Sequence, residues 1–242
     1  MAWDTERTKR LLLDAATAEF SEHGLAGARV DRIAAAAGVN KERIYQYFGK
    51  KDELFATVLS EALQAALQAV NAEGTGPAAV GDYAARLFDH HIAHGEIPRL
   101  VYWEGLERGV EAAESPVRAA FHAEKVDRMQ RMLPGIGRVE AGELLLTLVS
   151  LVNAWPVLPQ LDALIIPGGG DREARIAARR ASIVGTVTAA AAAAMASVPD
   201  RPKASVQRAG RYGGVLGDVE ARAHRDLERL DDLQDGQRRG VR

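Results

Sequence analysis

Apolar residues recur at every third or fourth position along most of this 242-residue chain, and this spacing limits its fold more than any other feature. The repeat is longest after Asp52, where it runs without a break to Val70. Such spacing gathers apolar side chains on one face of an α-helix. The alternating runs of Val, Ile, Thr and aromatic residues that mark β-strands are missing, and aromatic residues make up only 5% of the sequence. The sequence therefore predicts an all-α protein.

The helical spacing divides the chain into segments that are separated by glycine and proline. Gly24 is expected to lie just beyond the end of the first helix, and Pro98 and Pro116 suit first-turn positions. The expected helices lie at 5–23, 30–37, 41–48, 52–70, 80–94, 98–113, 116–133, 139–161 and 171–198. Residues 199–242 carry few large apolar side chains, so we expect a poorly ordered tail with, at most, a weak helix at 218–233.

The composition excludes several classes of site and favours one compartment. Without cysteine, the chain forms neither disulfides nor thiolate zinc sites, and a reducing cytoplasm is its expected location. The first residues are charged before they are apolar, which is not the pattern of a secretion signal. The apolar stretches at 144–155 and 181–198 are too short or too rich in alanine for membrane spans, so we expect no membrane contact. The first 51 residues are net positive on an otherwise acidic chain, as expected when one end meets a polyanion.

Residues 38–55, GVNKERIYQYFGKKDELF, place aromatic and basic side chains on the outside of a short helix. With Asn40 as the N-cap, Val39 and Ile44 form a hydrophobic staple that fixes the entry of the chain. At about 100° per residue, Ile44 and Phe48 point inward together. The outward face then carries a polar ridge with tyrosines on its flanks, made of Glu42, Arg43, Gln46, Tyr45 and Tyr47. This arrangement fits a helix in a major groove, where the ridge meets base edges and the tyrosine hydroxyls meet phosphates.

The helix expected at 30–37 and the turn at Gly38 complete a helix-turn-helix. Lys51, at the start of the following helix, places a cation beside free backbone N–H groups and so predicts a phosphate contact. The same pattern is compatible with a short, solvated amphipathic helix on any helical protein. A helical interaction protein whose basic end binds RNA or a membrane is a further alternative, which the helix-turn-helix spacing argues against.

The segments LLDAATAEFSEHG and VDRIAAAAGVNKERIYQYFGKKDELF resemble the N-terminal domain of the TetR family of bacterial ligand-responsive transcriptional regulators. The likeness covers about the first quarter of the chain and includes the turn glycine and the Y-x-x-F-x-x-K spacing. It rests on Leu12, Ala15, Ala16, Phe20, Gly24, Val30, Ile33, Ala34, Ala37, Gly38, Val39, Lys41, Ile44, Tyr45, Tyr47, Phe48, Lys51, Leu54 and Phe55.

The resemblance implies a homodimer with two heads that bind double-stranded DNA, and a C-terminal body that binds a small-molecule inducer. A repressor is the expected type of regulator. We divide the chain accordingly into a helix-turn-helix DNA-binding domain at 1–51, a ligand-binding and dimerisation domain at 52–198 and the tail at 199–242. The DNA contacts carried over by position are Asn40, Lys41, Arg43, Tyr45, Tyr47 and Lys51.

Three departures from the family's pattern bear on the DNA contacts. Ala28 and Arg29 replace threonines that cap the second helix, so we expect the cap to be lost, although Arg29 can still reach a phosphate. Glu42 and Arg43 replace a common small pair, so the bases that they read are expected to be unusual. Gly and Lys at 49–50 replace Pro-Ser, which should weaken the cap of the helix that follows.

The body is expected to hold its ligand among large apolar side chains with a few polar ones. The candidates are Phe88, His91, Tyr102, Trp103, Phe121, His122 and Trp155. The same residues also fit an ordinary hydrophobic core. No cofactor is expected, and the sequence does not identify the inducer.

The run DHHIAHGE at 89–96 raises the alternative of an all-helical metal-dependent enzyme. His90 and His94 stand four residues apart and His91 and His94 three apart, which suits metal ligands. These histidines also fit a polar helix end, where a protonated imidazole is mildly favoured. No H-E-x-x-H motif, second cluster or nucleophile–base pair supports catalysis, so we expect neither a metal site nor an enzyme.

The helices expected at 139–161 and 171–198 are the predicted dimer interface. The first carries a dense apolar face, and the alanines at 189–194 allow a close helix approach. Two helices from each protomer would bury one isologous interface. Such pairing places the heads about one DNA turn apart, roughly 34–36 Å, and predicts a palindromic operator.

Overall fold

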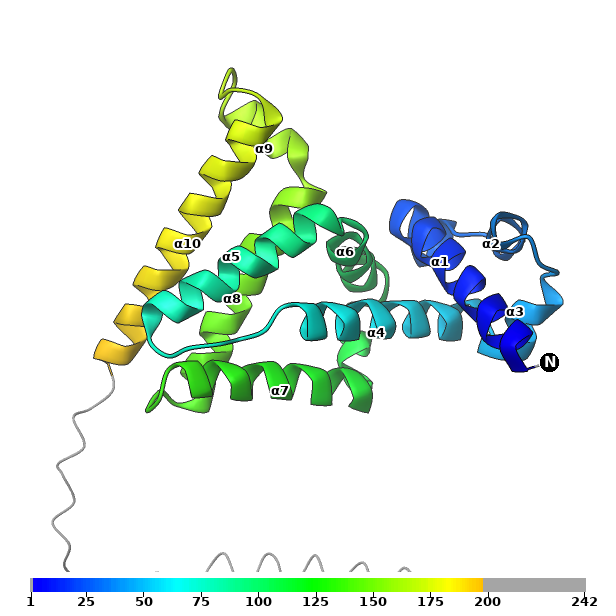
Figure 1. Cartoon of the computed structure of the whole chain (residues 1–242), viewed down its shortest axis with the longest axis horizontal. Helices are drawn as coiled ribbons and strands as arrows, with labels where there is room; N and C mark the ends of the chain where they lie inside the picture. The colour runs from blue at the N-terminus through cyan, green and yellow to red at the C-terminus, as the bar shows by residue number, and fades with distance from the viewer. Residues whose placement is uncertain (1, 198–242) are drawn as a thin grey trace, which may run out of the picture. The chain divides into compact units, whose positions relative to one another are not determined.

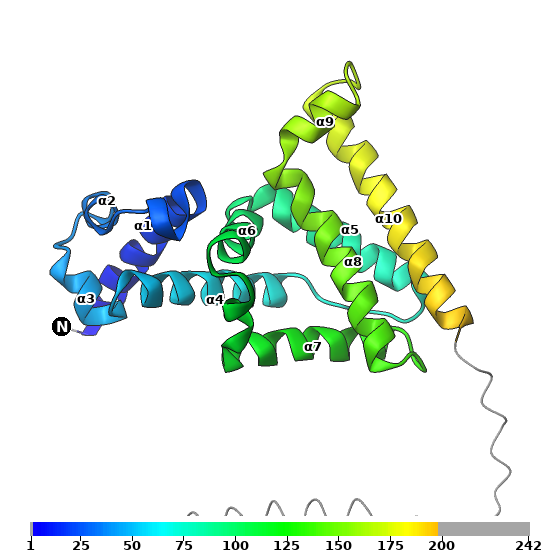
Figure 2. The same ribbon diagram turned by 180° about the vertical axis from the view of Figure 1, so that it is seen from behind.

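The computed structural model describes residues 2–197, which form helices joined by short connections (Figures 1 and 2). The elements are α1 (Ala2–Gly27), α2 (Val30–Ala37), α3 (Glu42–Phe48), α4 (Lys51–Ala69), α5 (Pro77–Ala93), α6 (Glu96–Arg108), the 3-10 helix η1 (Gly109–Glu114), α7 (Pro116–Met132), α8 (Arg138–Val157), α9 (Pro159–Ile165) and α10 (Arg172–Ala196). No β-strand occurs within residues 2–197, and the all-α prediction is confirmed. The predicted tail at 199–242, with its weak helix at 218–233, lies outside the described residues.

Helices α1, α2 and α3 pack around one apolar core together with the start of α4. Leu12, Phe20 and Ile44 are fully buried in this core. Phe20 meets Phe55 of α4 edge to face, with ring centroids 5.2 Å apart. Gly24 bends the chain near the end of α1 with a φ of 69°, which glycine adopts without strain. The bend agrees with the prediction that the first regular helix ends here.

Helix α4 connects this head to the rest of the chain. Its first turns contribute Leu54 and Phe55 to the head core, and Leu63 and Leu67, further along, belong to the same cluster as Ile97 of α6. Figure 1 shows α4, in cyan, leading from α3 to the loop before α5. One helix therefore carries side chains of both the N-terminal head and the cavity wall described below.

A second apolar core lies among α5, α7, α8 and α10. Phe88 of α5, Leu148 of α8 and Val187 of α10 are fully buried in it. Helices α5 and α10 lie alongside each other, as both views show. The two helices approach closely at Gly81, where a Cβ atom would collide with Thr188.

The segment expected as one helix at 139–161 is two helices, so this prediction is wrong. Helix α8 ends at Val157, and α9 begins at Pro159 after a bend of 86°. Pro159 has no backbone N–H to continue α8, and it disfavours the helical conformation at Leu158, whose φ and ψ are −117° and 53°.

Among the described residues, no single helix has the length and apolar character of a membrane span; α8 and α9 reach that length only when taken together.

The helix expected at 98–113 also ends earlier than predicted. Helix α6 stops at Arg108, because Gly109 takes a φ of 53° that breaks the helical path. The 3-10 helix η1 then occupies the remaining residues up to Glu114. Ser115 accepts a hydrogen bond from the Arg118 backbone N–H and caps α7.

Candidate nucleic-acid interface and ligand cavity

The turn between α2 and α3 is built by one glycine and one asparagine. Gly38 adopts a φ of 67°, and the backbone N–H groups after α2 return to the carbonyls of Ala34 and Ala35. Asn40 Oδ1 then accepts from the Glu42 backbone N–H at 3.3 Å, as a cap does, although Lys41 is the residue directly before α3. The predicted role of Asn40 at the start of α3 therefore agrees with the structure.

The outer face of α3 carries the predicted polar ridge. Arg43 Nη1 donates to Gln46 Oε1 at 3.3 Å and to the Tyr47 hydroxyl at 3.1 Å. Tyr45 is 50% exposed, and Glu42 is also exposed. Ile44, on the opposite side, is fully buried. Ile44 thus fixes α3 to the core of the head, and the opposite face of the helix presents a hydrogen-bonded arginine to solvent.

Both lysines predicted to meet phosphate already have partners in the head. Lys41 Nζ lies 3.0 Å from Asp31 Oδ1 of α2, and this hydrogen-bonded carboxylate raises the pKa of Lys41. Lys51 Nζ donates to the backbone carbonyls of Ala28 at 3.2 Å and Ala26 at 3.4 Å. An ammonium group has three N–H donors, so Lys51 keeps one for a further acceptor.

The start of α2 has a cap that the sequence did not predict. Arg29 supplies no side-chain cap, as expected, but Glu19 of α1 takes that role. Its Oε1 accepts from the Arg29 backbone N–H at 2.8 Å and from Arg32 Nε at 2.8 Å. The side chain of Arg29 is exposed and remains available to a phosphate. The cap from residues 28–29 is therefore lost as expected, and a carboxylate of α1 that the sequence did not indicate meets the Arg29 N–H instead.

The start of α4 is likewise better capped than the sequence indicated. Glu53 Oε2 accepts from the Lys50 backbone N–H at 2.6 Å, which is the returning half of a capping box. The pair at 49–50 thus does not leave the helix end unsatisfied.

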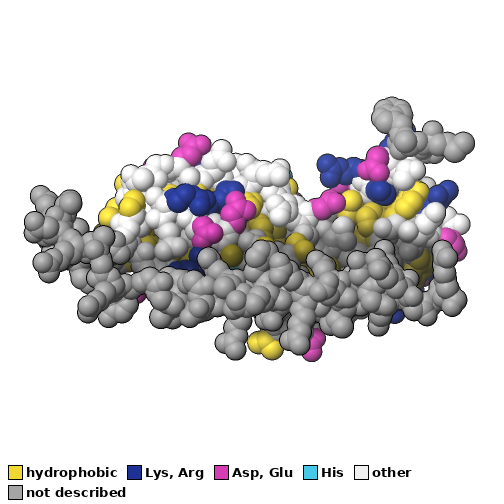
Figure 3. All heavy atoms as spheres, turned by 90° about the horizontal axis from the view of Figure 1, so that it is seen from below, with side chains coloured by type: hydrophobic (Ala, Val, Ile, Leu, Met, Phe, Trp, Pro, Cys, Tyr) yellow, Lys and Arg dark blue, Asp and Glu magenta, His cyan; other side chains and the backbone are white. Residues whose placement is uncertain are grey.

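Figure 3 shows Lys and Arg side chains interspersed with Asp and Glu on the described surface, so in this view no continuous face carries charge of a single sign.

Helix α6 holds the end of α1 through three hydrogen bonds. Arg99 Nε and Trp103 Nε1 donate to the Ser21 carbonyl at 2.8 and 3.2 Å. Glu107 Oε2 accepts from the Ala26 backbone N–H at 3.0 Å. Trp103, predicted as a ligand contact, thus joins the body to the head instead. Tyr102 is half-buried on the same helix.

Three of the seven predicted ligand residues line one small cavity. His91 of α5 meets Phe121 and His122 of α7 around a volume of about 50 Å³. Its walls come from α4, α5, α6, α7 and α8. Sequence reasoning missed three polar members of the lining, Arg118, Lys125 and Asn153. Arg118, His122 and Lys125 recur at helical spacing on α7, a signal that the sequence did contain.

Ionisable groups of this cavity have pKa values far from their ordinary ones. Burial lowers the pKa of His91 to about 3, so its imidazole is neutral at pH 7. Partial burial, with Arg118 and Arg128 nearby, lowers the pKa of Lys125 to about 8. Arg118 Nη2 pairs with Glu104 Oε2 at 2.7 Å. The cavity therefore combines apolar walls with two cationic side chains.

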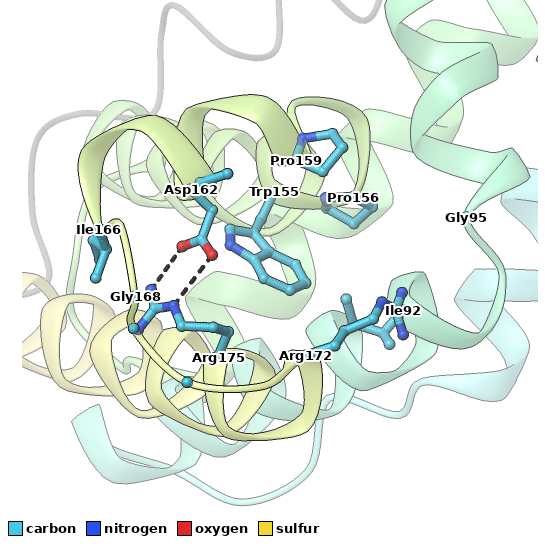
Figure 4. A pocket seen from close by; sticks show the side chains of 13 residues that line it. Ile92, Gly95, Trp155, Pro156, Pro159, Asp162, Ile166, Gly168, Arg172 and Arg175 are labelled. Atoms are coloured by element: carbon cyan, nitrogen blue, oxygen red, sulfur yellow. Dashed lines mark hydrogen bonds and ion pairs between the residues drawn. The ribbon is translucent and has the colours of Figure 1, made fainter.

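Phe88 and Trp155 lie elsewhere. Phe88 is fully buried in the second core, with its ring centroid 5.9 Å from that of Trp155. Trp155 lines an open cavity of about 560 Å³ beside α9 (Figure 4). There Asp162 accepts two hydrogen bonds from Arg175, at 2.6 and 3.1 Å, which lower the pKa of Asp162. Because these charges satisfy each other, this cavity offers fewer free polar groups to a ligand.

The histidines at 90–94 do not form a metal site in the described part of the chain. The ring centroids of His90 and His94 are 4.5 Å apart, and His94 Nδ1 lies 3.3 Å from Glu96 Oε1. His91 instead lines the cavity described above. Among the side chains described at 5–112 and 115–197, no group of three or more potential ligands is arranged to hold a metal ion. The alternative of a metal-dependent enzyme is not supported.

Two family models match the chain. The model for bacterial regulatory proteins of the tetR family matches residues 12–58. The model for a tetracyclin repressor-like C-terminal domain matches residues 79–190. Together they span more than half of the sequence.

Individual proteins resemble the chain over most of its length. The HTH-type transcriptional repressor SCO4008 of Streptomyces coelicolor is 40% identical over 176 residues, which is 70% of this chain and 88% of that protein. The solved structure of the regulator SCO4942 from Streptomyces coelicolor has a TM-score of 0.60 and 33% identity, across 74% of this chain and 96% of that one. A transcriptional regulator from Rhodococcus sp. shares the fold, with a TM-score of 0.55 at 24% identity, across 75% of this chain and 96% of that one.

Proposed function

The chain belongs to the tetR family of bacterial regulatory proteins, which are DNA-binding transcriptional regulators, and we propose that it is a cytoplasmic repressor released from its operator by a small molecule. We assign DNA binding to residues 1–51, and ligand binding and dimerisation to residues 52–198. The matches of the two family models, at 12–58 and 79–190, support this division.

We assign the reading of bases to the outer face of α3. The observation that carries this assignment is the Arg43 side chain, held by Gln46 and Tyr47 above a fully buried Ile44. An arginine presents two parallel N–H groups that suit the O6 and N7 acceptors of guanine in the major groove. A side chain that is already ordered loses less conformational entropy when it binds. Glu42 and Gln46 flank Arg43 and would contribute to base choice.

Phosphate contacts are assigned to the residues around this ridge. The exposed hydroxyl of Tyr45 and the side chains of Arg29 and Lys41 stand on the same head, and Lys51 keeps one free N–H donor. Lys41 would have to share its charge between Asp31 and a phosphate. Such contacts position the head without reading sequence, so they govern affinity and its salt dependence.

The dimer interface is assigned to α8 and α10. Helix α8 exposes Val139 and Leu146, at 74% and 62%, while Leu144, Leu148 and other apolar residues of the same helix are buried in the second core. Helix α10 presents the alanine-rich stretch at 189–194, which permits close contact with a partner helix. A two-fold symmetric pair would present two recognition helices to two half-sites, which favours an inverted repeat in the operator.

Helix α6 is the proposed mechanical link between ligand and DNA. Ile97 and Val101 line the 50 Å³ cavity, while Arg99 and Trp103 on the same helix bind the Ser21 carbonyl of α1. A ligand that widens the cavity would move α6 and, through it, the head. It would release DNA to the extent that it favours the moved conformation over the DNA-bound one.

The experiment that tests this function is selection of DNA sites from a random pool with the full chain. We expect an inverted repeat, followed by a mobility shift that is tighter on this repeat than on scrambled DNA of the same length. A pool that yields no repeated sequence, or equal affinity for both duplexes, would contradict the proposed function.

A further inference from the structure

We propose that the 50 Å³ cavity among α4, α5, α6, α7 and α8 recognises a small monocarboxylate with a short apolar tail. This inference rests on the proposed function, because it names the chemical class of the ligand that the regulator senses. Two features carry it: a cation without a counter-charge, and buried polar atoms without partners.

Two cations line the cavity, and only one of them has an anionic partner. Arg118 pairs with Glu104 at 2.7 Å, and both side chains are largely buried, so this pair is neutral as a unit. Among the side chains that the structure describes, at 5–112 and 115–197, none forms an ion pair with Lys125, and no Asp or Glu lines the cavity. Its neighbour Arg128 is paired with Glu124 at 2.7 Å. A half-buried cation beside apolar walls is stabilised by an anion that enters the same space.

Several buried polar atoms at this cavity lack hydrogen-bond partners. By hydrogen-bond geometry these atoms are Arg118 Nη1, His91 Nδ1 and Asn153 Oδ1, although the His91 and Asn153 side chains interact weakly with each other, which opposes the lowering of the His91 pKa. Native interiors rarely leave such atoms unsatisfied without a ligand or water. A carboxylate offers two acceptor oxygens, which suit the N–H donors of Lys125, Arg118 and a neutral His91. The Asn153 amide can present either its oxygen or its N–H groups, because the two orientations have the same shape.

The remaining walls suit the apolar part of the ligand. Leu87, Ile97 and Val101 contribute aliphatic surface, and the Phe121 ring lies 5.4 Å from Lys125 Nζ. On the same measure a cavity needs about 10–15 Å³ to hold one water molecule, so about 50 Å³ admits a ligand of only a few non-hydrogen atoms. A short chain is therefore favoured, and a larger acid requires the cavity to widen. A second charge on the ligand would face apolar walls, which argues against a dicarboxylate.

The test compares butanoate, butanamide and butylamine, which have similar size and differ in charge. Binding to the full chain is measured by calorimetry and by the rise in Tm at pH 7, with chloride keeping the ionic strength constant. We expect butanoate to bind at least about tenfold more tightly than either analogue, a factor that corresponds to about 1.4 kcal/mol. Equal affinity for butanoate and butanamide, or no binding of butanoate, would overturn the inference.

Variants of Lys125 connect the preference to this cavity. Lys125→Met should remove the preference for butanoate, and Lys125→Arg should retain it. This pair of results would show that the preference is lost because the charge is lost, and not because the protein misfolds. The matched control is Arg131→Met, which removes an exposed cation from the same helix and should leave the preference unchanged. A preference for butanoate that survives in Lys125→Met would overturn the assignment to this cavity.

The outcome for the ligand is separable from the outcome for DNA. The stated preference for butanoate supports the inference even if the chain binds no DNA, a result that would overturn the proposed function. Specific DNA binding without any preference for butanoate in calorimetry would overturn the inference and leave the proposed function standing.

The charge of Lys125 provides a second readout. Its pKa of about 8 predicts that affinity for butanoate is constant between about pH 6 and 7 and falls by about tenfold per pH unit well above pH 8. The titratable or charged groups that face it come from α5 and α7, and they are Tyr83, His91, Arg118, His122 and Arg128. Burial and neighbouring cations lower the pKa of His91 to about 3 and of His122 to about 4, and burial raises that of Tyr83. Affinity that does not change between pH 7 and 9.5 would contradict a contact between Lys125 and the carboxylate.

Discussion

Replacing Glu19 with alanine should destabilise the helix-turn-helix head without touching the face that we propose reads DNA. The substitution removes the acceptor for the Arg29 backbone N–H and for Arg32 Nε, both at 2.8 Å. Loss of an N-cap acceptor costs about 1 kcal/mol. Loss of an ion pair to a partly exposed arginine adds about 1 kcal/mol at most. The free energy of unfolding should therefore fall by about 1–2 kcal/mol, as the sum of these two contributions.

Denaturant unfolding, followed by circular dichroism at pH 7, measures this change. The matched control is Glu22→Ala, because Glu22 stands on the same helix with 73% of its side chain exposed, 4.0 Å from His23. That substitution should change the unfolding free energy by less than about 0.5 kcal/mol. Hydrogen exchange should show faster exchange in α2 of Glu19→Ala than in the native protein, with α10 unchanged. Equal losses for the two substitutions, or no loss for Glu19→Ala, would refute the reasoning.

The pH dependence gives an independent check. Burial alone would raise the pKa of Glu19, but hydrogen bonds from Arg32 and from the Arg29 N–H outweigh it and lower the pKa below the ordinary 4.5. A carboxylate with a lowered folded-state pKa contributes stability above its unfolded pKa and loses it as the pH falls through the folded value. The stability difference between the native chain and Glu19→Ala should thus be full at pH 7 and shrink below about pH 4.5.

Further outcomes follow for the head and its link to the body. Arg43→Ala should cost about 1–3 kcal/mol on the selected operator and relax base preference at one position, as mobility shifts on variant sites would reveal. Lys51→Met should weaken binding to all sequences alike and reduce the salt slope by about one; a loss confined to the operator would contradict a phosphate contact. Trp103→Phe removes the N–H donated to Ser21, so denaturant unfolding should show a loss of about 1 kcal/mol. No loss would mean that Arg99 alone is sufficient to satisfy that carbonyl.

The arrangement of the head was predictable because its determinants are local. Gly38 sets the turn, Asn40 meets the start of α3, and Ile44 turns inward at the position that helical spacing requires. The capping of α2 was not predictable in this way. Its acceptor, Glu19, lies ten residues before Arg29 on another helix, and nothing in a helical wheel brings these two residues together.

The cavity was only partly predictable, for a physical reason. Choosing large aromatic residues found Phe121 but also selected Phe88 and Trp103, which pack in a core or bind α1. Aromatic side chains fill cores and line cavities equally well, so their presence does not separate the two roles. Lys125 carries more information, because a cation among apolar neighbours requires an explanation. Recognising it needs the positions of the surrounding helices, which the sequence alone does not provide.

The end of α1 and the residue that follows it, residues 26–28, are held from three different helices. Arg32 of α2 and Lys51 of α4 donate to their carbonyls, and Glu107 of α6 accepts from one of their N–H groups. A hybrid regulator made by grafting only α2 and α3 onto a related protein would separate these residues from Lys51 and Glu107. The smallest transplantable unit therefore runs from α1 into the first turn of α4. The recipient would also need a carboxylate on its sixth helix, at the position that Glu107 occupies here.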